Sequence, residues 1–222
     1  MSDLDWTAWQ LADSAFPTGG FAHSGGIEAA IQGGAIRDER SIITTVEAVV
    51  HQTAFGALPA VSAVLREPAR FDEVEDRLDA VLTNHVARRA SVTQGQAMLS
   101  AAPRIFRDAA LRGWAADCRG SGTPGHLAPV FGYTAWSLGF DADSAAELYL
   151  FMSLRSALSA AVRLGAVGPI AAQALIRELI PSARQAARQA SVLDLDDLYQ
   201  ALPLLELLQS GQDRLYSRLF QS

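Results

Sequence analysis

The chain has 222 residues, of which 50% are hydrophobic and 19% charged, so it can bury a sizeable core and is not a disordered protein. Its formal net charge is -6 and no run of basic residues occurs, which argues against nucleic-acid binding. All 18 basic residues are arginine. The absence of lysine argues against a P-loop NTPase and excludes Schiff-base chemistry.

The sequence contains few signals for targeting, disulfide formation or metal binding through cysteine. The single cysteine, Cys118, cannot form an intramolecular disulfide or a cysteine-rich zinc site. The acidic N-terminus lacks the pattern of a signal peptide, and the apolar stretch at 156–176 contains Arg163 and a Gly-Pro pair. These features predict a cytoplasmic protein without a membrane span.

The first distinctive segment is the glycine-rich loop "FPTGGFAHSGGIEAA" at 16–30. Gly20 and Gly25 have the spacing of a P-loop, but Gly26 stands where the lysine is required. The loop therefore lacks the group that would hold a phosphate.

Two interpretations of this loop remain open. Its glycines and Pro17 either end one helix, bring helices close together and start the next, or they form an exposed backbone patch that a partner grips. Ser24 or Gly25 is expected to cap the following helix. Glu28 is expected to lie in that helix's first turn, at its positive dipole end.

Helical periodicity follows in two segments. Apolar residues repeat at spacings of three and four in 41–55 (Ile42, Val46, Val49, Val50) and in 70–99 (Phe71, Val74, Leu78, Val81, Leu82). The second segment contains no breaker before Gly95.

Two more helices are predicted toward the C-terminus. In 144–163, Ser144 and Glu147 have capping-box spacing. An apolar stripe interrupted by Arg155 is expected to be buried there (Leu148, Phe151, Met152, Leu158). A further apolar face contains Pro203, which predicts a kink or a late helix start (Leu198, Leu202, Leu205, Leu208).

Strand signals are scarce, since no alternation extends over six residues and no hairpin turn dipeptide occurs. Helix breakers cluster at 17–26, 119–125, 165–169 and 181–182. We predict an all-α, single-domain bundle of roughly eight to ten helices spanning residues 1–222.

The four histidines show no metal-binding spacing. His51 and His85 are expected to be partly buried on helices, whereas His23 and His126 lie in predicted loops. A dispersed Ser-His-Asp site stays open, although no GxSxG motif occurs. One alternative function is therefore a helical metal-dependent hydrolase that uses the two loop histidines, and another is a helical regulator of some other protein.

The C-terminal segment 211–222, "GQDRLYSRLFQS", is unusually apolar. Four large apolar groups near a terminus must either dock on the protein's own core or become ordered on a partner. In the second case Arg214 and Arg218 would pair with the partner's carboxylates.

The two terminal segments resemble the signatures of the urease accessory protein UreF family. "LADSAFPTGGFAHSGGIEAAI" is similar to its N-terminal signature and "RLYSRLFQS" to its C-terminal one. Three interior blocks also resemble the family, "LTNHVARRASVTQGQAML", "HLAPVFGYTAWSLGF" and "LSAAVRLGAVGPIAAQ". The chain departs from many members in the residues after Arg163, in Gln212 and Asp213, and in Gln221.

The resemblance implies an all-helical protein that is usually dimeric and is not an enzyme. It implies binding to UreD (UreH in some organisms) and to the GTPase UreG, in an assembly that delivers nickel to apo-urease. The protein would bridge the other components and influence GTP hydrolysis by UreG. No cofactor or metal is expected to be held stably by this chain, and no nucleic acid or membrane is expected as a partner.

Site residues follow from the same resemblance. It implies partner binding by residues of the N-terminal signature, by Arg163 and by the tail (Pro17, Gly19, Gly20, Ser24, Gly25, Glu28, Arg163, Tyr216, Ser217, Arg218, Leu219, Phe220). Segment 211–222 would be the docking tail for UreD/UreH. Residues of the interior blocks either pack and cap internally or contribute to this surface (Arg88, Ser91, Gln94, Gly132, Ser159). No catalytic and no metal-binding residue is predicted.

Overall fold

A computed structural model describes residues 2–222, and within them every regular element is helical. The α-helices are α1 (Asp3–Ala12), α2 (Ile27–Gln32), α3 (Glu39–Gly56), α4 (Leu58–Arg66), α5 (Phe71–Val81), α6 (His85–Ile105), α7 (Ala109–Ser121), α8 (Leu127–Ser137), α9 (Ala142–Arg163), α10 (Pro169–Ala190) and α11 (Pro203–Ser210). The all-α prediction is confirmed. The described residues form eleven α-helices, one more than the expected upper bound, together with four short 3-10 helices.

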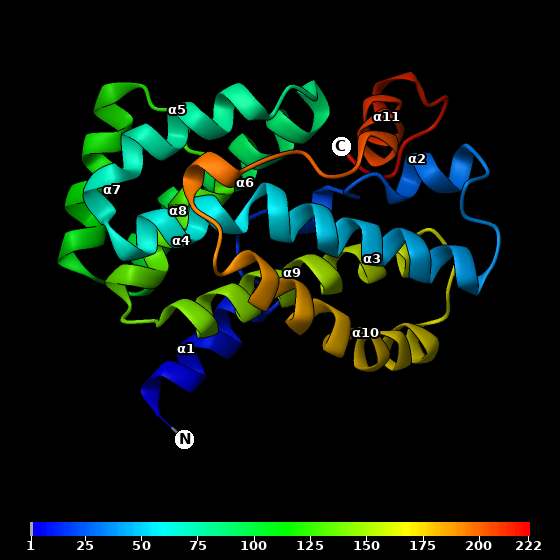
Figure 1. Cartoon of the computed structure of the whole chain (residues 1–222), viewed down its shortest axis with the longest axis horizontal. Coiled ribbons are helices and arrows are strands. Elements are labelled where there is room, and N and C mark those ends of the chain that lie inside the picture. The colour runs from blue at the N-terminus through cyan, green and yellow to red at the C-terminus, as the bar shows by residue number, and fades with distance from the viewer. Residues whose placement is uncertain (1) are drawn as a thin grey trace.

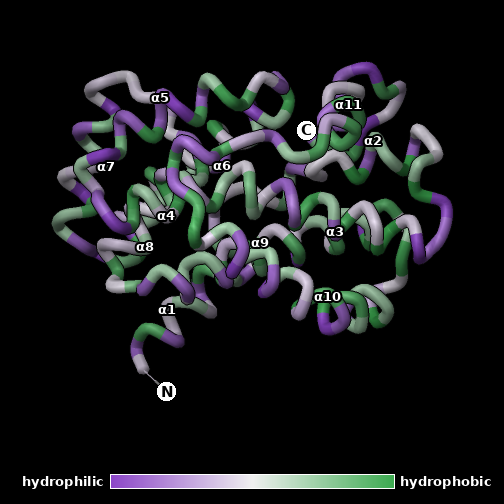
Figure 2. Tube along the Cα trace, in the orientation of Figure 1, coloured by the Kyte–Doolittle hydropathy of each residue, from purple (hydrophilic) through white to green (hydrophobic). Residues whose placement is uncertain are grey.

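The helices surround one hydrophobic cluster that extends from α1 to the C-terminal tail. α9 packs on α3, α4 and α10, and α8 packs on α4 and α6. Figure 1 shows α3 and α9 running through the middle of the molecule, with α1 projecting from one side. In Figure 2 hydrophobic and hydrophilic residues alternate along most helices, as expected for helices with one buried face.

Glycine permits the closest helix contacts. A Cβ on Gly132 of α8 would lie 2.6 Å from the carbonyl oxygen of Val61 in α4. A Cβ on Gly95 of α6 would lie 2.0 Å from the carbonyl oxygen of Gly125, just before α8. The sequence pattern suggested that Gly95 breaks a helix. Instead, Gly95 lies inside α6 and lets this helix contact the backbone that leads into α8.

Local capping explains where two predicted helices differ from the structure. The 70–99 segment is interrupted at residues 82–84, because the Asn84 side chain accepts hydrogen bonds from the Val86 and Ala87 amides (2.9 and 3.2 Å) and starts α6. The predicted Ser144–Glu147 box is wrong. Asp141 caps α9 by accepting from the Ser144 amide (2.8 Å), so α9 starts at Ala142.

The buried face of one helix was predicted correctly and that of another was not. The 41–55 stripe is buried as expected, but in α9 the residues Leu148, Phe151 and Met152 are only half-buried. Their place in the core is taken by neighbours one or two positions away (Ala146, Tyr149, Leu150, Leu154). In α11 the late start is confirmed, because the helix begins at Pro203 and ends before Gly211.

Judged by length and composition alone, one helical stretch of the described residues is long and apolar enough to cross a membrane. It lies in Glu39–Arg66, not in the 156–176 segment, and its most apolar window of 18 residues has a mean hydropathy of 1.4. Of its most apolar window, 61% is buried inside the protein, and core helices of ordinary globular proteins meet the same criteria.

Candidate partner-binding site

The glycine-rich loop between α1 and α2 adopts a backbone that only glycine accepts readily. Gly19, Gly25 and Gly26 have φ angles of 72°, 63° and 96°, in the left-handed region. Gly26, not Ser24 or Gly25, is the residue before α2, and it makes no side-chain cap. A Cβ there would also lie 2.8 Å from the Gln209 side chain of α11. The first interpretation of the loop, a turn that allows close packing, is therefore present in the structure.

The C-terminal tail returns to this loop. The Ser24 amide donates to the Ser222 carbonyl (2.6 Å), and the Gln221 amide donates to the Ala22 carbonyl (2.8 Å). The His23 ring nitrogen Nδ1 hydrogen-bonds the Ser222 hydroxyl. Figure 1 places the C-terminus beside α2 and α11. The two terminal signatures of the sequence thus form one surface unit, which we call the loop–tail unit (residues 16–28 and 212–222).

Glu28 is the centre of this unit. Its side chain is 1% exposed and accepts hydrogen bonds from the Leu219 amide (2.6 Å), the Phe220 amide (3.1 Å) and Gln212 Nε2 (2.6 Å). A buried carboxylate is stable only when such donors replace water. Glu28 therefore anchors the tail to α2, in addition to lying in the first turn of that helix.

Arg163 closes the same unit from α9. Its guanidinium lies 4.3 Å from the centre of the Phe220 ring, in cation–π geometry, and donates to the Phe21 carbonyl. Phe220 is itself 3% exposed. The last aromatic residue of the tail is therefore an internal anchor.

Other tail side chains point outward. Tyr216 is fully exposed and Leu219 is 52% exposed, while Phe21 of the loop is 69% exposed. Leu204 and Leu207 of neighbouring α11 are exposed as well. Exposed large apolar side chains on and beside the loop–tail unit are typical of protein-binding surfaces.

A charged cluster fixes the tail's other edge. Asp213 accepts hydrogen bonds from Arg89 (2.8 Å) and Arg218 (3.1 Å) and contacts the His85 ring (3.1 Å). The Arg89 bond holds the pKa of the Asp213 carboxyl below its ordinary value. Arg89, Gln209 and Gln212 were not predicted as site residues. Their contacts span over a hundred residues, and no local pattern indicates such pairs.

The structure divides the predicted partner-binding residues into two groups. Ser24, Glu28 and Phe220 are buried inside the loop–tail unit, while Gly19, Gly20 and Gly25 are half-buried. The others are exposed (Pro17, Arg163, Tyr216, Ser217, Arg218, Leu219). Buried members shape the surface, and exposed members are available to touch a partner.

The burial of the four histidines is the reverse of what the sequence suggested. His51 and His85 are exposed, whereas the loop residues His23 and His126 are 7% and 0% exposed. Among the described residues, no three His, Cys, Asp or Glu side chains form a group that could hold a metal ion. Burial lowers the pKa of both His23 and His126, which favours the uncharged form of each ring.

His126 belongs to an interior network that has the composition of a catalytic triad. Its Nε2 contacts Asp79 (2.9 Å) and its Nδ1 contacts Ser91 Oγ (3.1 Å). Arg88 donates to the same Asp79 oxygen (2.6 Å), and Ser91 also accepts from the Leu127 amide (3.3 Å). These contacts tie α5, α6 and the start of α8 together around a fully buried ring. In this network Ser91 is half-buried against the His126 ring, whereas Arg88 is exposed and pairs with Asp79 from the surface.

Glu75 completes this interior network from α5. Its carboxylate is 1% exposed and accepts from the Gly125 amide (3.0 Å) and the His126 amide (2.7 Å). Burial raises its pKa to about 7 despite these bonds. Two other residues of the interior blocks lie outside this network. Gly132 makes the contact between α4 and α8, and the Gln94 side chain lies next to Gly20.

Comparisons with known proteins give the same family for the central part of the chain and for nearly its whole length. A family model described as UreF matches residues 36–180. The chain is 35% identical to a urease accessory protein F of rice (Oryza sativa subsp. indica), over 97% of the chain and 84% of that protein. It is 36% identical to the Arabidopsis thaliana urease accessory protein F, over 100% of the chain and 94% of that protein. A urease accessory protein UreF of Paenarthrobacter aurescens is 32% identical, with 96% of each chain covered.

Proposed function

Because this chain belongs to the UreF family of urease accessory proteins, we propose that it is a non-enzymatic adaptor chaperone that bridges UreD/UreH and the GTPase UreG. The assembly delivers nickel to apo-urease and is cytoplasmic. This chain supplies binding surface and acts as a homodimer, without holding nickel or a cofactor itself. GTP is hydrolysed on UreG, and this chain influences that hydrolysis.

The loop–tail unit is the observation that supports this proposal. It joins the segments that resemble the family's two terminal signatures, and it presents Tyr216, Leu219 and Phe21 on one rigid base. A surface whose backbone is already fixed binds with a smaller loss of conformational entropy than a free tail would. We assign UreD/UreH to this surface.

The test replaces exposed side chains only. The double variant Tyr216→Asp, Leu219→Asp places charge on the docking surface without touching the internal anchors Glu28 and Phe220. We expect an unchanged melting temperature and at least a tenfold loss of UreD/UreH capture after co-expression, measured by pull-down and size exclusion with UreG present. Ile170→Asp is the matched control, because Ile170 is 87% exposed at the start of α10 and should leave capture intact.

Full capture by the double variant would refute the assignment of UreD/UreH to the loop–tail unit. Removing residues 211–222 altogether is a poorer test, because it also strips Glu28 of its three donors and would unfold the loop.

A further inference from the structure

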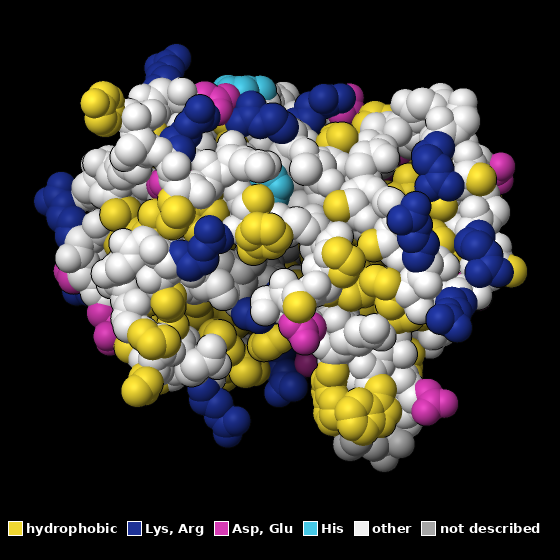
Figure 3. Space-filling model, turned by 180° about the vertical axis from the view of Figure 1, so that it is seen from behind, with side chains coloured by type: hydrophobic (Ala, Val, Ile, Leu, Met, Phe, Trp, Pro, Cys, Tyr) yellow, Lys and Arg dark blue, Asp and Glu magenta, His cyan; other side chains and the backbone are white. Residues whose placement is uncertain are grey.

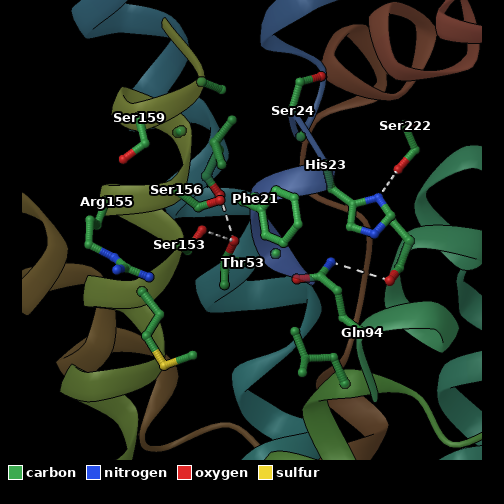
Figure 4. A pocket seen from close by; sticks show the side chains of 18 of the residues that line it. Phe21, His23, Ser24, Thr53, Gln94, Ser153, Arg155, Ser156, Ser159 and Ser222 are labelled. Carbon is green, nitrogen blue, oxygen red and sulfur yellow. Dashed lines mark hydrogen bonds between the residues drawn. The ribbon is translucent and has the colours of Figure 1, made fainter. Parts of the chain in front are cut away.

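A cavity of about 280 Å³ lies beneath the glycine-rich loop. Its walls come from the loop, α3, α6, α9 and the tail. Figure 4 shows Arg155, Ser156 and Ser159 along α9 on one side, and His23, Ser24 and Ser222 on the other. Apolar side chains complete the walls (Phe16, Val49, Val86, Met152).

Arg155 is the unusual group in this cavity. Of the 18 arginines, only Arg70 and Arg155 are half-buried, and the others are exposed. Arg70 pairs with Glu73 and Asp194. Arg155 has no ion pair or hydrogen bond within the described residues, and its Nε is buried without a partner.

Among the described residues, no acid forms an ion pair with this guanidinium, although the charge of Asp13 partly offsets the effect of burial on its pKa. Asp13 also lines the cavity, but it forms no ion pair with Arg155, and its Oδ1 accepts from the Ala15 amide (2.8 Å). Burial lowers the pKa of Arg155, yet an arginine remains charged at any physiological pH. The fold thus maintains a half-buried positive charge beside a cavity, and such a charge is costly unless something pairs with it.

The surrounding polar groups are suited to an anion. Ser156 lies one residue along α9 from Arg155 and makes no hydrogen bond within the described residues, and Ser24 Oγ is buried without a partner. Hydroxyl groups donate to oxyanions, and the planar guanidinium fork matches two oxygens of one carboxylate or phosphate.

We propose that this cavity is a binding site for an oxyanion, a carboxylate or phosphate group held by Arg155 with help from the neighbouring hydroxyls. Two sources share this chemistry, a free small anion and an acidic side chain inserted by a bound protein. The loop–tail unit lines part of this site, including Phe21, but Tyr216 and Leu219 of the docking surface do not line it. The proposal does not depend on the adaptor role.

The direct experiment is an NMR titration of the intact protein. Sodium benzoate, acetate and phosphate are added separately at constant ionic strength, with sodium chloride as the reference, while the Arg155 Nε–Hε signal is followed. We expect a saturable shift with at least one oxyanion and none with chloride. Arg155→Gln should weaken that binding at least tenfold, whereas Arg177→Gln, at an exposed position on α10, should leave it unchanged. Arg155→Lys should give an intermediate affinity, because it keeps the charge but loses the fork.

A second arm distinguishes the source. If no free anion binds, but Arg155→Gln specifically lowers capture of UreD/UreH, UreG or a second copy of the chain at unchanged melting temperature, the oxyanion comes from a protein side chain. If neither free anions nor protein capture respond to Arg155, the proposal is overturned. Because the NMR arm reads the wild-type side chain directly, it stands even if a variant folds poorly.

Discussion

At the scale of single residues, Glu28 decides whether the tail stays on the molecule. Glu28→Gln keeps one acceptor oxygen but replaces the other with an amide donor that faces the Phe220 amide and Gln212. Hydrogen bonds to charged groups contribute about 1.5–3 kcal/mol each, so we expect a loss of about 2–4 kcal/mol in the free energy of unfolding. Urea denaturation measures it, and hydrogen exchange at the Leu219 and Phe220 amides should accelerate.

Glu47→Gln is the control for this change, because Glu47 is an exposed residue of α3 without a hydrogen-bond partner in the described residues. Equal stability of the two variants would show that Glu28 does not anchor the tail. The sequence placed Glu28 correctly at a helix start, but its real partners lie up to 192 residues away. Local patterns carry no information about such pairs, so the joining of the two terminal segments was not predictable from spacing.

At the scale of helices, two glycines that lie inside α-helices should change the stability of the protein in opposite directions when each is replaced by alanine. Gly95→Ala in α6 would drive a methyl group to within 2.0 Å of the Gly125 carbonyl oxygen, so the start of α8 must move. We expect a loss of about 2–3 kcal/mol, in the range of overpacked cores. Gly113→Ala in α7 meets nothing within 4 Å and should stabilise the protein by about 0.5–1 kcal/mol, because alanine is the better helix former.

Thermal and urea unfolding of both variants measure this contrast, and destabilisation of similar size in both would remove the close-contact explanation. The same glycines show what the sequence could predict about the helices. Periodicity identified the helical class and the buried face of α3, since those depend on neighbours three and four residues apart. It misjudged Gly95, because composition alone does not distinguish a helix breaker from a helix contact. It also missed the cap of α9 at Asp141, since several polar residues there could start the helix.

At the scale of the whole molecule, stability should depend on pH through the buried Glu75. Its pKa is raised to about 7, so the folded state binds the proton more tightly than the unfolded state does between pH 4.5 and 7. Glu75 therefore contributes stability at low pH that is lost as the pH rises through this window. The buried histidines act in the opposite direction, because their lowered pKa values make the fold less stable on acidification.

Glu75→Gln isolates the carboxyl contribution. The glutamine keeps an acceptor oxygen for only one of the Gly125 and His126 amides, which costs stability at every pH, but it does not ionise, so the part of the difference that changes with pH reports the carboxyl group. We expect the free energy of unfolding of the variant minus that of the wild type to increase by about 1–3 kcal/mol between pH 5 and pH 8 and to level off above pH 7. Urea denaturation at four pH values gives this difference directly. A difference that is flat or falls with pH contradicts a raised pKa at Glu75.

The bond between Glu28 and the Phe220 amide also sets an order of events during synthesis. The two residues are 192 positions apart, and ribosomes add roughly 5–20 residues per second, so about 10–40 s pass between them. Until residues 212–222 emerge, the glycine-rich loop lacks its donors, and His23 and Ser24 remain open to water. A nascent chain therefore cannot present the finished surface, and only polypeptides whose translation has reached this segment can compete for a partner.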